Sequence, residues 1–178
     1  MSAPAGVVLR RLAATDLAAF QHYRHDPEVG RWQGWTPRSD ADALAFLNEM
    51  AAIPLFAPGQ WTQLGIADAS TGALLGDIGI HISADGRGAE FGFSLARAAQ
   101  GRGIAAAAVG AAIAMVFEQT GAEHISAQTD ARNTACVRLL QRLGATRVAR
   151  IDTEFRGEPC EEWRYRLATR PTTPGDHG

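Results

Sequence analysis

The sequence predicts an α+β fold: a mixed, mostly antiparallel central sheet of about seven strands, with one parallel strand–helix–strand crossover and helices on both faces. Three observations support this prediction. Apolar segments of strand length recur along the chain between turn residues. Short glycine-containing turns, at residues 70–72 and 84–88, join neighbouring segments as hairpins. A long alanine-rich helical segment at 104–119 separates two further strand segments, and a connection of that length returns to a parallel strand.

The N-terminal part of the chain predicts one strand and two helices. Thr15 and Asp16 provide the N-cap of the first helix, which Asp26 and Pro27 end. The second helix shows apolar residues at helical period and is closed by Pro54. The expected order is strand 7–12, helix 17–24, aromatic loop 32–37 and helix 40–52.

Three strands then form an antiparallel meander, and the crossover and a C-terminal hairpin complete the sheet. Gly121 follows the crossover helix, and Gly144 stops the helix before the hairpin. We expect a single domain over residues 1–168 and a disordered C-terminal tail at 169–178. The expected elements are strands 61–67, 74–82 and 89–95, helix 104–119, strand 124–129, helix 133–143, and strands 147–155 and 161–167.

Composition narrows the class of protein. A net charge of −2 over 178 residues gives no global basic surface, so nucleic acid is not an expected partner. The first residues lack the apolar core of a signal segment, and the longest apolar run, 104–117, is shorter than the roughly 20 residues of a membrane span. We therefore expect a cytoplasmic protein without a membrane partner. The spacing of Cys136, Cys160 and the histidines indicates neither a disulfide nor a metal site. Monomer and homodimer both remain open.

A glycine-rich loop, Gln100-Gly101-Arg102-Gly103-Ile104-Ala105, lies between a strand and the long helix. Glycines let the backbone approach a ligand closely, and the N–H groups of a helix's first turn point at it, so the loop suits a phosphate or pyrophosphate. The first expectation is an adenine-nucleotide cofactor. Residues 101–106 also satisfy the dinucleotide pattern G-x-G-x-x-G/A. A dinucleotide fold, however, needs its first glycine directly at the strand end and several further strand–helix units, and neither condition is met.

From residue 89 to 167 the motifs resemble those of the GNAT superfamily of N-acetyltransferases. The acetyl-CoA loop of that family has the form Q/R-x-x-G-x-G/A, which Gln100, Gly103 and Ala105 match. Residues 133–145 look like the family's N-x-A-S-x-x-x-L-E-K-L-G-F helix. The segments 9–12, 26–29, 75–79 and 154–157 resemble the branch that acetylates ribosomal-protein N-termini (RimJ/RimL-like). The resemblance covers about the whole folded chain.

The resemblance implies acetyl-CoA-dependent transfer to a primary amine, on a small molecule or a protein N-terminus, within a ternary complex. In the family the two crossover strands splay apart, and pantetheine enters the gap and hydrogen-bonds the main chain of the first strand. The expected acetyl-CoA-binding residues are Phe93, Ser94, Leu95, Gln100, Gly101, Arg102, Gly103, Ile104, Ala105, Ala106 and Asn133. Asn133 opens its helix, so a role as N-cap would by itself explain an asparagine at this position.

Three side chains are candidates for proton transfer. A lysine-like amine, with a pKa of about 10.4, is almost wholly protonated at pH 7, so a base must help. Glu90, in the family pattern A-E-x-G-x-x-L, would act through a water; otherwise it is a solvated carboxylate or pairs with Arg87. His81 is an alternative base, or a structural histidine at a strand end. Cys136 stands where the N-terminal-acetylating branch has a serine near the sulfur, and is a weak donor or a packing residue.

The acceptor side is predicted from the aromatic loop. Trp32, Gln33 and Trp35 are expected substrate-binding residues, because tryptophans in a loop form walls of ligand pockets, including pockets for cations. The alternative is a core plug between helix and sheet. Leu140 occupies the position of the tyrosine that protonates the thiolate in many superfamily members. An acyl-CoA-binding sensor or regulatory module without turnover is therefore the alternative function.

Overall fold

The computed structural model describes residues 6–171, which build one seven-stranded sheet in the order β1-β2-β3-β4-β5-β7-β6. Neighbouring strands are antiparallel except for β4 and β5, which are parallel. The predicted fold class is therefore confirmed. The strands are β1 Val7–Arg11, β2 Trp61–Asp68, β3 Leu74–Ile82, β4 Gly88–Leu95, β5 His124–Asp130, β6 Thr146–Phe155 and β7 Glu158–Thr169.

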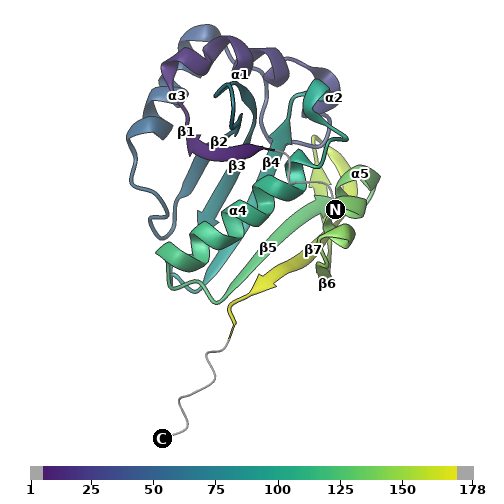
Figure 1. Ribbon diagram of the computed structural model, residues 1–178. Coiled ribbons are helices and arrows are strands. Elements are labelled where there is room, and N and C mark those ends of the chain that lie inside the picture. The colour runs from purple at the N-terminus through teal and green to yellow at the C-terminus, as the bar shows by residue number, and fades with distance from the viewer. Residues whose placement is uncertain (1–5, 172–178) are drawn as a thin grey trace, which may run out of the picture.

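Helices cover both faces of the sheet. α4 lies across one face and packs on a large apolar core that includes Ile78, Ile80 and Ile125 (Figure 1). α1 and α3 enclose a smaller core on the other face, around Tyr23 and Leu47. The helices are α1 Leu17–Arg24, α2 Pro27–Gly30, α3 Asp40–Ala52, α4 Ile104–Gln119 and α5 Thr134–Arg142, with short 3-10 helices η1 Ala14–Asp16 and η2 Arg97–Ala99.

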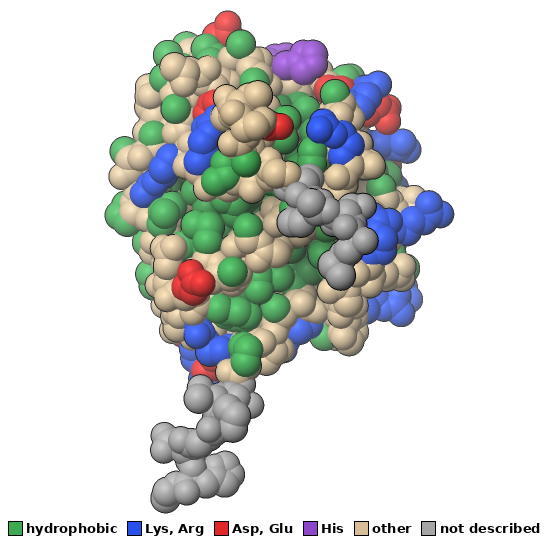
Figure 2. Space-filling model, in the orientation of Figure 1, with side chains coloured by type: hydrophobic (Ala, Val, Ile, Leu, Met, Phe, Trp, Pro, Cys, Tyr) green, Lys and Arg blue, Asp and Glu red, His purple; other side chains and the backbone are tan. Residues whose placement is uncertain are grey.

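The face that carries α4 is poor in charge. Figure 2 shows apolar side chains across it, with arginine side chains gathered along the edge where α5 and the β6–β7 hairpin lie. Arg138 and Arg142 of α5 are both exposed. None of the helices described is long and apolar enough to cross a bilayer.

Side chains alternate along β3 between the two faces. Ile78 and Ile80 point into the α4 core, so Asp77, Gly79 and His81 point to the opposite face, which we call the polar face. The pairing register places Trp61, His81, Glu90 and Ser126 in one cross-strand row on this face. α1 and α3 cover its Asp77 end and leave the Trp61 end exposed.

α1 has its predicted bounds and Asp16 occupies its N-cap position, but two local details differ from the prediction. The Asp16 carboxylate makes no cap bond to α1; it accepts from the Ala13 N–H and from the Arg10 guanidinium, at 2.8–2.9 Å. These bonds lower the pKa of Asp16, the Arg10 hydrogen bonds first. Pro27 does not merely end α1 but begins α2, whose cap is Asp26, because the fixed φ of proline suits a first helical position.

The C-terminal strand is longer than its apolar pattern indicated. β7 continues through Thr169, and the Arg170 guanidinium donates to the carbonyls of Ala122 and Thr120 at 2.8 and 2.7 Å. These hydrogen bonds hold the end of β7 against the loop between α4 and β5. The rest of the predicted tail, residues 172–178, lies outside the described residues.

Candidate functional site

β4 and β5 separate half-way along their length. They pair only from Gly88–His124 to Phe91–Ala127, after which β4 pairs with β3 alone. The Ala89 carbonyl, which faces β5, accepts from the Ser126 hydroxyl; alternate residues share this direction, so the carbonyls of Phe93 and Leu95 face the gap. The crossover thus leaves one stretch of strand without a partner on its β5 side.

The two carbonyls that face the gap are satisfied by side-chain amides. Gln33 Nε2 donates to the Phe93 carbonyl at 3.0 Å, and Gln100 Nε2 donates to the Leu95 carbonyl at 3.2 Å. Buried backbone acceptors need partners, and an open strand edge offers them in a row. The gap can therefore accept an extended chain with amide groups in place of these side chains.

The loop that follows η2 is shaped by two glycines. Gly101 and Gly103 have φ of 73° and 75°, a left-handed backbone that other residues adopt at a cost, and Gly103 is the N-cap of α4. No atom lies within 4 Å of a Cβ built at either position. Helix geometry leaves the N–H groups of the first turn, Ile104 to Ala106, without intrahelical acceptors. The first turn carries no acidic residue, and exposed Arg102 enters no ion pair among residues 6–171, so the loop favours an anion.

The two candidate bases are direct neighbours. His81 and Glu90 pair across β3 and β4 on the polar face, and both are half-buried. The alternative partner for Glu90 is engaged elsewhere: Arg87 binds Glu123 through two bonds of 3.0 Å. Among the described residues the Glu90 carboxylate has no hydrogen bond or ion pair.

Trp61 was not recognised from the sequence as a site residue. Its ring lies 5.2 Å from the His81 ring, and the residue is 48% exposed. As the first residue of β2 it carries no motif that marks it. Only the strand register places it in the row of His81 and Glu90.

The start of α5 holds the other two predicted residues. Asn133 Oδ1 accepts from the Cys136 N–H at 3.2 Å, so Asn133 is an N-cap in this structure. Burial raises the pKa of the Cys136 thiol, which therefore keeps its proton at neutral pH. Leu140 is fully buried in the core, and no hydroxyl is present at that point of the helix.

The aromatic loop is fixed to the sheet at several points. Trp35 Nε1 donates to the Ser94 hydroxyl at 3.2 Å, and its ring packs on the α1–α3 core and under the Arg24 guanidinium, 4.4 Å from the ring centroid. The Trp32 ring contacts the guanidinium groups of Arg31 and Arg132, at 4.9 and 5.2 Å. The loop therefore joins α1, β4 and the start of α5.

Arg156, at the tip of the β6–β7 hairpin, also holds this loop. Its Nη2 donates to the carbonyls of Gln33 and Gly30 at 2.9 and 3.1 Å. Arg156 has φ of 52°, in the left-handed region, and forms the hairpin turn together with Gly157, whose φ is 82°. Sequence reasoning placed the hairpin in a family motif but could not see this contact, which spans more than half the chain.

These contacts predict that Trp35 contributes mainly to stability. We expect Trp35→Ala to lower the free energy of unfolding by roughly 3 kcal/mol, the low end for a buried tryptophan, because the ring is only half-buried. Trp35→Phe, which loses the bond to Ser94 but keeps a ring, should lose about 1 kcal/mol. Denaturant titration measures both. Unchanged stability with a raised KM for the acceptor would instead identify Trp35 as a pocket wall.

A buried polar cluster anchors α1 to the polar face. The fully buried Asp77 carboxylate accepts from Arg24 Nη2 at 2.8 and 2.9 Å, from Gln63 at 2.5 Å and from the Tyr23 hydroxyl. Burial, and then the charge of Asp77, raise the pKa of Tyr23, which stays a donor. Loss of either Arg24 or Asp77 would leave the charge of the other buried and unpaired. The cluster therefore holds the Arg24 side chain in the position in which it packs against the Trp35 ring.

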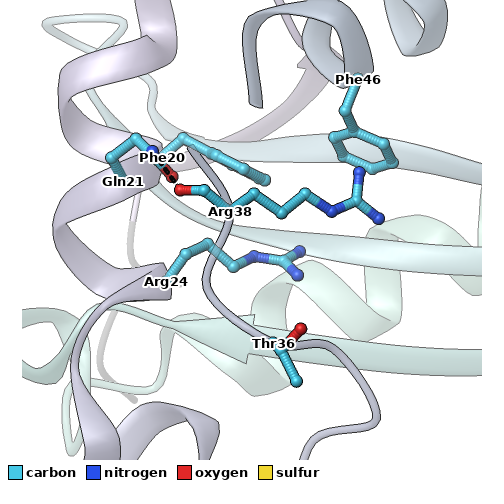
Figure 3. A pocket seen from close by; sticks show the side chains of 6 residues that line it. All are labelled: Phe20, Gln21, Arg24, Thr36, Arg38 and Phe46. Carbon is cyan, nitrogen blue, oxygen red and sulfur yellow. Dashed lines mark hydrogen bonds between the residues drawn. The ribbon is translucent and has the colours of Figure 1, made fainter. Parts of the chain in front are cut away.

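Beside this cluster lies a hollow of about 20 Å³, large enough for about one water molecule. Gln21 Oε1 and Arg24 Nε are buried without a hydrogen-bond partner among the described residues. Figure 3 shows Arg24 and Arg38 reaching into this region, with Gln21 bonded to the Arg38 carbonyl. The hollow contains none of the predicted site residues. Its lining is Phe20, Gln21, Arg24, Thr36, Arg38 and Phe46.

Known proteins share this sequence pattern and this fold. The chain is 28% identical over 142 residues to the uncharacterized N-acetyltransferase p20 of Bacillus licheniformis, covering 77% of each protein. The acetyltransferase (GNAT family) of Bacillus anthracis superposes with a TM-score of 0.79 at 18% identity, over 90% of this chain and 93% of that one. The spermidine N-acetyltransferase of Vibrio cholerae, solved in complex with CoA and spermine, gives a TM-score of 0.76 at 20% identity, over 90% and 94%.

The model of the Acetyltransferase (GNAT) domain family matches residues 7–146. This range includes the split between β4 and β5, the Gly101–Gly103 loop, Glu90 and the start of α5. The sequence resemblance and the described geometry thus coincide on the same segment. The chain belongs to the acetyltransferase (GNAT) domain family and is an acyltransferase.

Proposed function

We propose that this acyltransferase moves the acetyl group of acetyl-CoA to a primary amine by direct transfer in a ternary complex. The observation that carries the proposal is the unpartnered edge of β4, where the carbonyls of Phe93 and Leu95 face a gap in the sheet. Pantetheine has amide groups at a spacing that can replace a strand. A small-molecule amine and a protein N-terminus, as in the RimJ/RimL-like branch, are both acceptors for this chemistry.

In this proposal the cofactor lies along the gap and over the glycine loop. The N–H groups of Ile104 to Ala106 hold the pyrophosphate, helped by Gly101 and Gly103, which keep the approach clear of side chains. Main-chain groups of Phe93 to Leu95 hold pantetheine, and Gln33 and Gln100 share or release the carbonyls that they now occupy. Asn133, the N-cap of α5, contacts pantetheine in this proposal.

The chemistry requires one proton to leave the amine and one to reach the sulfur. The neutral amine attacks the thioester carbonyl, a C–N bond forms, and the C–S bond breaks with the electron pair on sulfur. Glu90 accepts the ammonium proton, directly or through a water, and proximity within the complex supplies much of the rate. In this proposal the protonated Cys136 thiol of α5 donates a hydrogen bond that stabilises the leaving thiolate.

A thiol-release assay tests the proposed function. Purified protein is mixed with acetyl-CoA and a panel of primary amines, and free CoA is measured together with the mass of each acetylated amine. The 17 lysine and arginine positions of the chain are all arginine, so the enzyme has no lysine side chain that would add a background of self-acetylation. Acetyl-CoA binding without CoA release for any amine would indicate a binding module instead.

The role of Cys136 can be separated from packing. If its thiol donates to the leaving sulfur, Cys136→Ala should lower kcat about fivefold, the equivalent of one neutral hydrogen bond of ~1 kcal/mol, and Cys136→Ser should keep the activity. Cys160→Ala is the matched control, because Cys160 is also a free, half-buried cysteine but lies in β7 and not in α5. Equal kcat for Cys136→Ala and wild type would make Cys136 a packing residue only.

A further inference from the structure

Two paired positions on the polar face, beside the split, carry no side chain. Gly79 and Gly92 pair across β3 and β4, between the His81–Glu90 pair and the Asp77–Ser94 pair. A Cβ at Gly79 would meet the Trp61 ring at 3.3 Å and the Gln63 side chain at 2.9 Å, whereas a Cβ at Gly92 would have no atom within 4 Å. Gly92 is exposed, and its backbone is not in the left-handed region. Backbone strain therefore does not explain the glycine.

Gly92 is also the first residue of β4 beyond the paired region. The last pair of the β4–β5 ladder is Phe91–Ala127. A bound chain that fills the gap like a strand would therefore end next to Gly92, where the gap closes. The thioester of a bound acetyl-CoA would then lie next to Gly92, with Glu90 one pleat away on the same face.

The charges around Gly92 differ on its two sides. Toward β2 lie His81 and the exposed Trp61 ring, whose faces attract cations. Toward β7 lie Arg166 and Arg164, which pair with Ser126 and Gln128 in register, and the carboxylate of Glu162, which accepts a hydrogen bond from Gln128. A positively charged substituent therefore meets two arginines and one carboxylate on the β7 side, whereas the Trp61 side offers it an exposed aromatic ring and no arginine in the same row. Backbone positions of Trp61 and Glu90 are two strand spacings apart, about 10 Å.

We propose that the acceptor amine reaches the thioester across Gly92, and that Trp61 binds a second positive charge on the acceptor. The reacting amine lies at Glu90, and the rest of the molecule extends over Gly79 toward the Trp61 ring. This inference rests on the proposed function and adds the acceptor class: primary amines with a further cationic group. It assigns acceptor recognition to Trp61, at the start of β2.

Substitution at Gly92 tests the approach path. Gly92→Val places a branched side chain in the open space without backbone strain, and valine suits a strand. We expect kcat/KM for every amine to fall about 10²-fold, the scale of a 1 Å displacement of the acceptor, with unchanged acetyl-CoA binding and an unchanged melting temperature. Gly92→Ala should give a smaller loss of kcat/KM in the same direction. It replaces the valine variant in the test if that variant does not fold. Full activity in folded Gly92 variants would overturn the proposed path.

Three amines of matched length test the role of Trp61: n-butylamine, 1,4-diaminobutane and 4-aminobutyrate, whose far ends are neutral, positive and negative. We expect wild type to prefer the diamine and to use 4-aminobutyrate least. Trp61→Ala should reduce the ratio of kcat/KM for diamine over n-butylamine about two- to fivefold, the value of an exposed cation–π contact, and Trp61→Phe should keep most of it. The diamine has two equivalent amino groups, which double its kcat/KM for statistical reasons. This factor is the same for wild type and variant and cancels when their ratios are compared.

The outcomes separate the two claims. Turnover of these amines with a ratio that Trp61→Ala does not change, or a preference for 4-aminobutyrate, would overturn the Trp61 assignment and leave the acetyltransferase function standing. Acetyl-CoA binding without turnover of any amine would remove both. The exposed Val148→Ala on β6 is the control for loss of a surface apolar side chain away from the polar face.

Discussion

Replacing Gly103 by valine is expected to abolish acetyl-CoA binding. Gly103 ends the loop and opens α4 with φ of 75°, and the first-turn N–H groups depend on that backbone for their direction. Valine both disfavours the left-handed conformation and fills the open space above the loop. Losing two hydrogen bonds to a charged phosphate, at ~1.5–3 kcal/mol each, corresponds to about 10²–10⁴-fold weaker binding. Isothermal titration with acetyl-CoA measures the change.

The matched control for this variant is Gly86→Val. Gly86 lies in the β3–β4 turn with φ of 73°, and no atom lies within 4 Å of a Cβ built there, so valine introduces the same backbone strain away from the loop. Both variants should lose about 1–3 kcal/mol of stability. Only Gly103→Val should lose acetyl-CoA. Full affinity in a folded Gly103→Val protein would remove the loop from the cofactor site.

Most of the fold could be predicted because local signals agree with tertiary structure. α3 begins and ends at the predicted residues, since Ser39 caps it and its apolar residues recur at helical period. β3 was also predicted to the residue, because its apolar run is bounded by glycine turns on both sides. The errors lie at α2 and at the ends of β7. α2 is a single turn, and such a short helix leaves almost no periodicity to detect.

The site was only partly predictable. The glycine loop is a contiguous motif, and Glu90 has a fixed offset from the strand end, so both could be read along the chain. Trp61, Gly92 and Arg156 could not, because their significance comes from strand register and from a hairpin tip that returns to a distant loop. Gln33 was placed on the acceptor side from its aromatic neighbours. The structure shows that its amide donates to the Phe93 carbonyl of β4, at the gap between β4 and β5.

Replacing Glu90 by glutamine is expected to lower kcat/KM by about 10² to 10⁴, the contribution of a general base, with acetyl-CoA affinity nearly unchanged. The amide keeps the shape of the side chain but takes no proton. Because Glu90 has no bonding partner among the described residues, no ion pair is broken by the change and stability should not fall. Steady-state kinetics with the best amine of the panel, together with acetyl-CoA titration, measure the two effects.

The pH profile distinguishes a lost base from a disturbed site. Without Glu90 only amine that is already neutral reacts, so kcat/KM of Glu90→Gln should rise with pH over a range displaced toward the amine's own pKa. His81→Gln tests the neighbouring imidazole, and Glu118→Gln, exposed on α4, is the control for loss of a carboxylate elsewhere. A loss below about threefold in Glu90→Gln, far under the range of general-base catalysis, would make Glu90 structural. If His81→Gln then carries the large loss, the base is the imidazole, held against Trp61 one strand away.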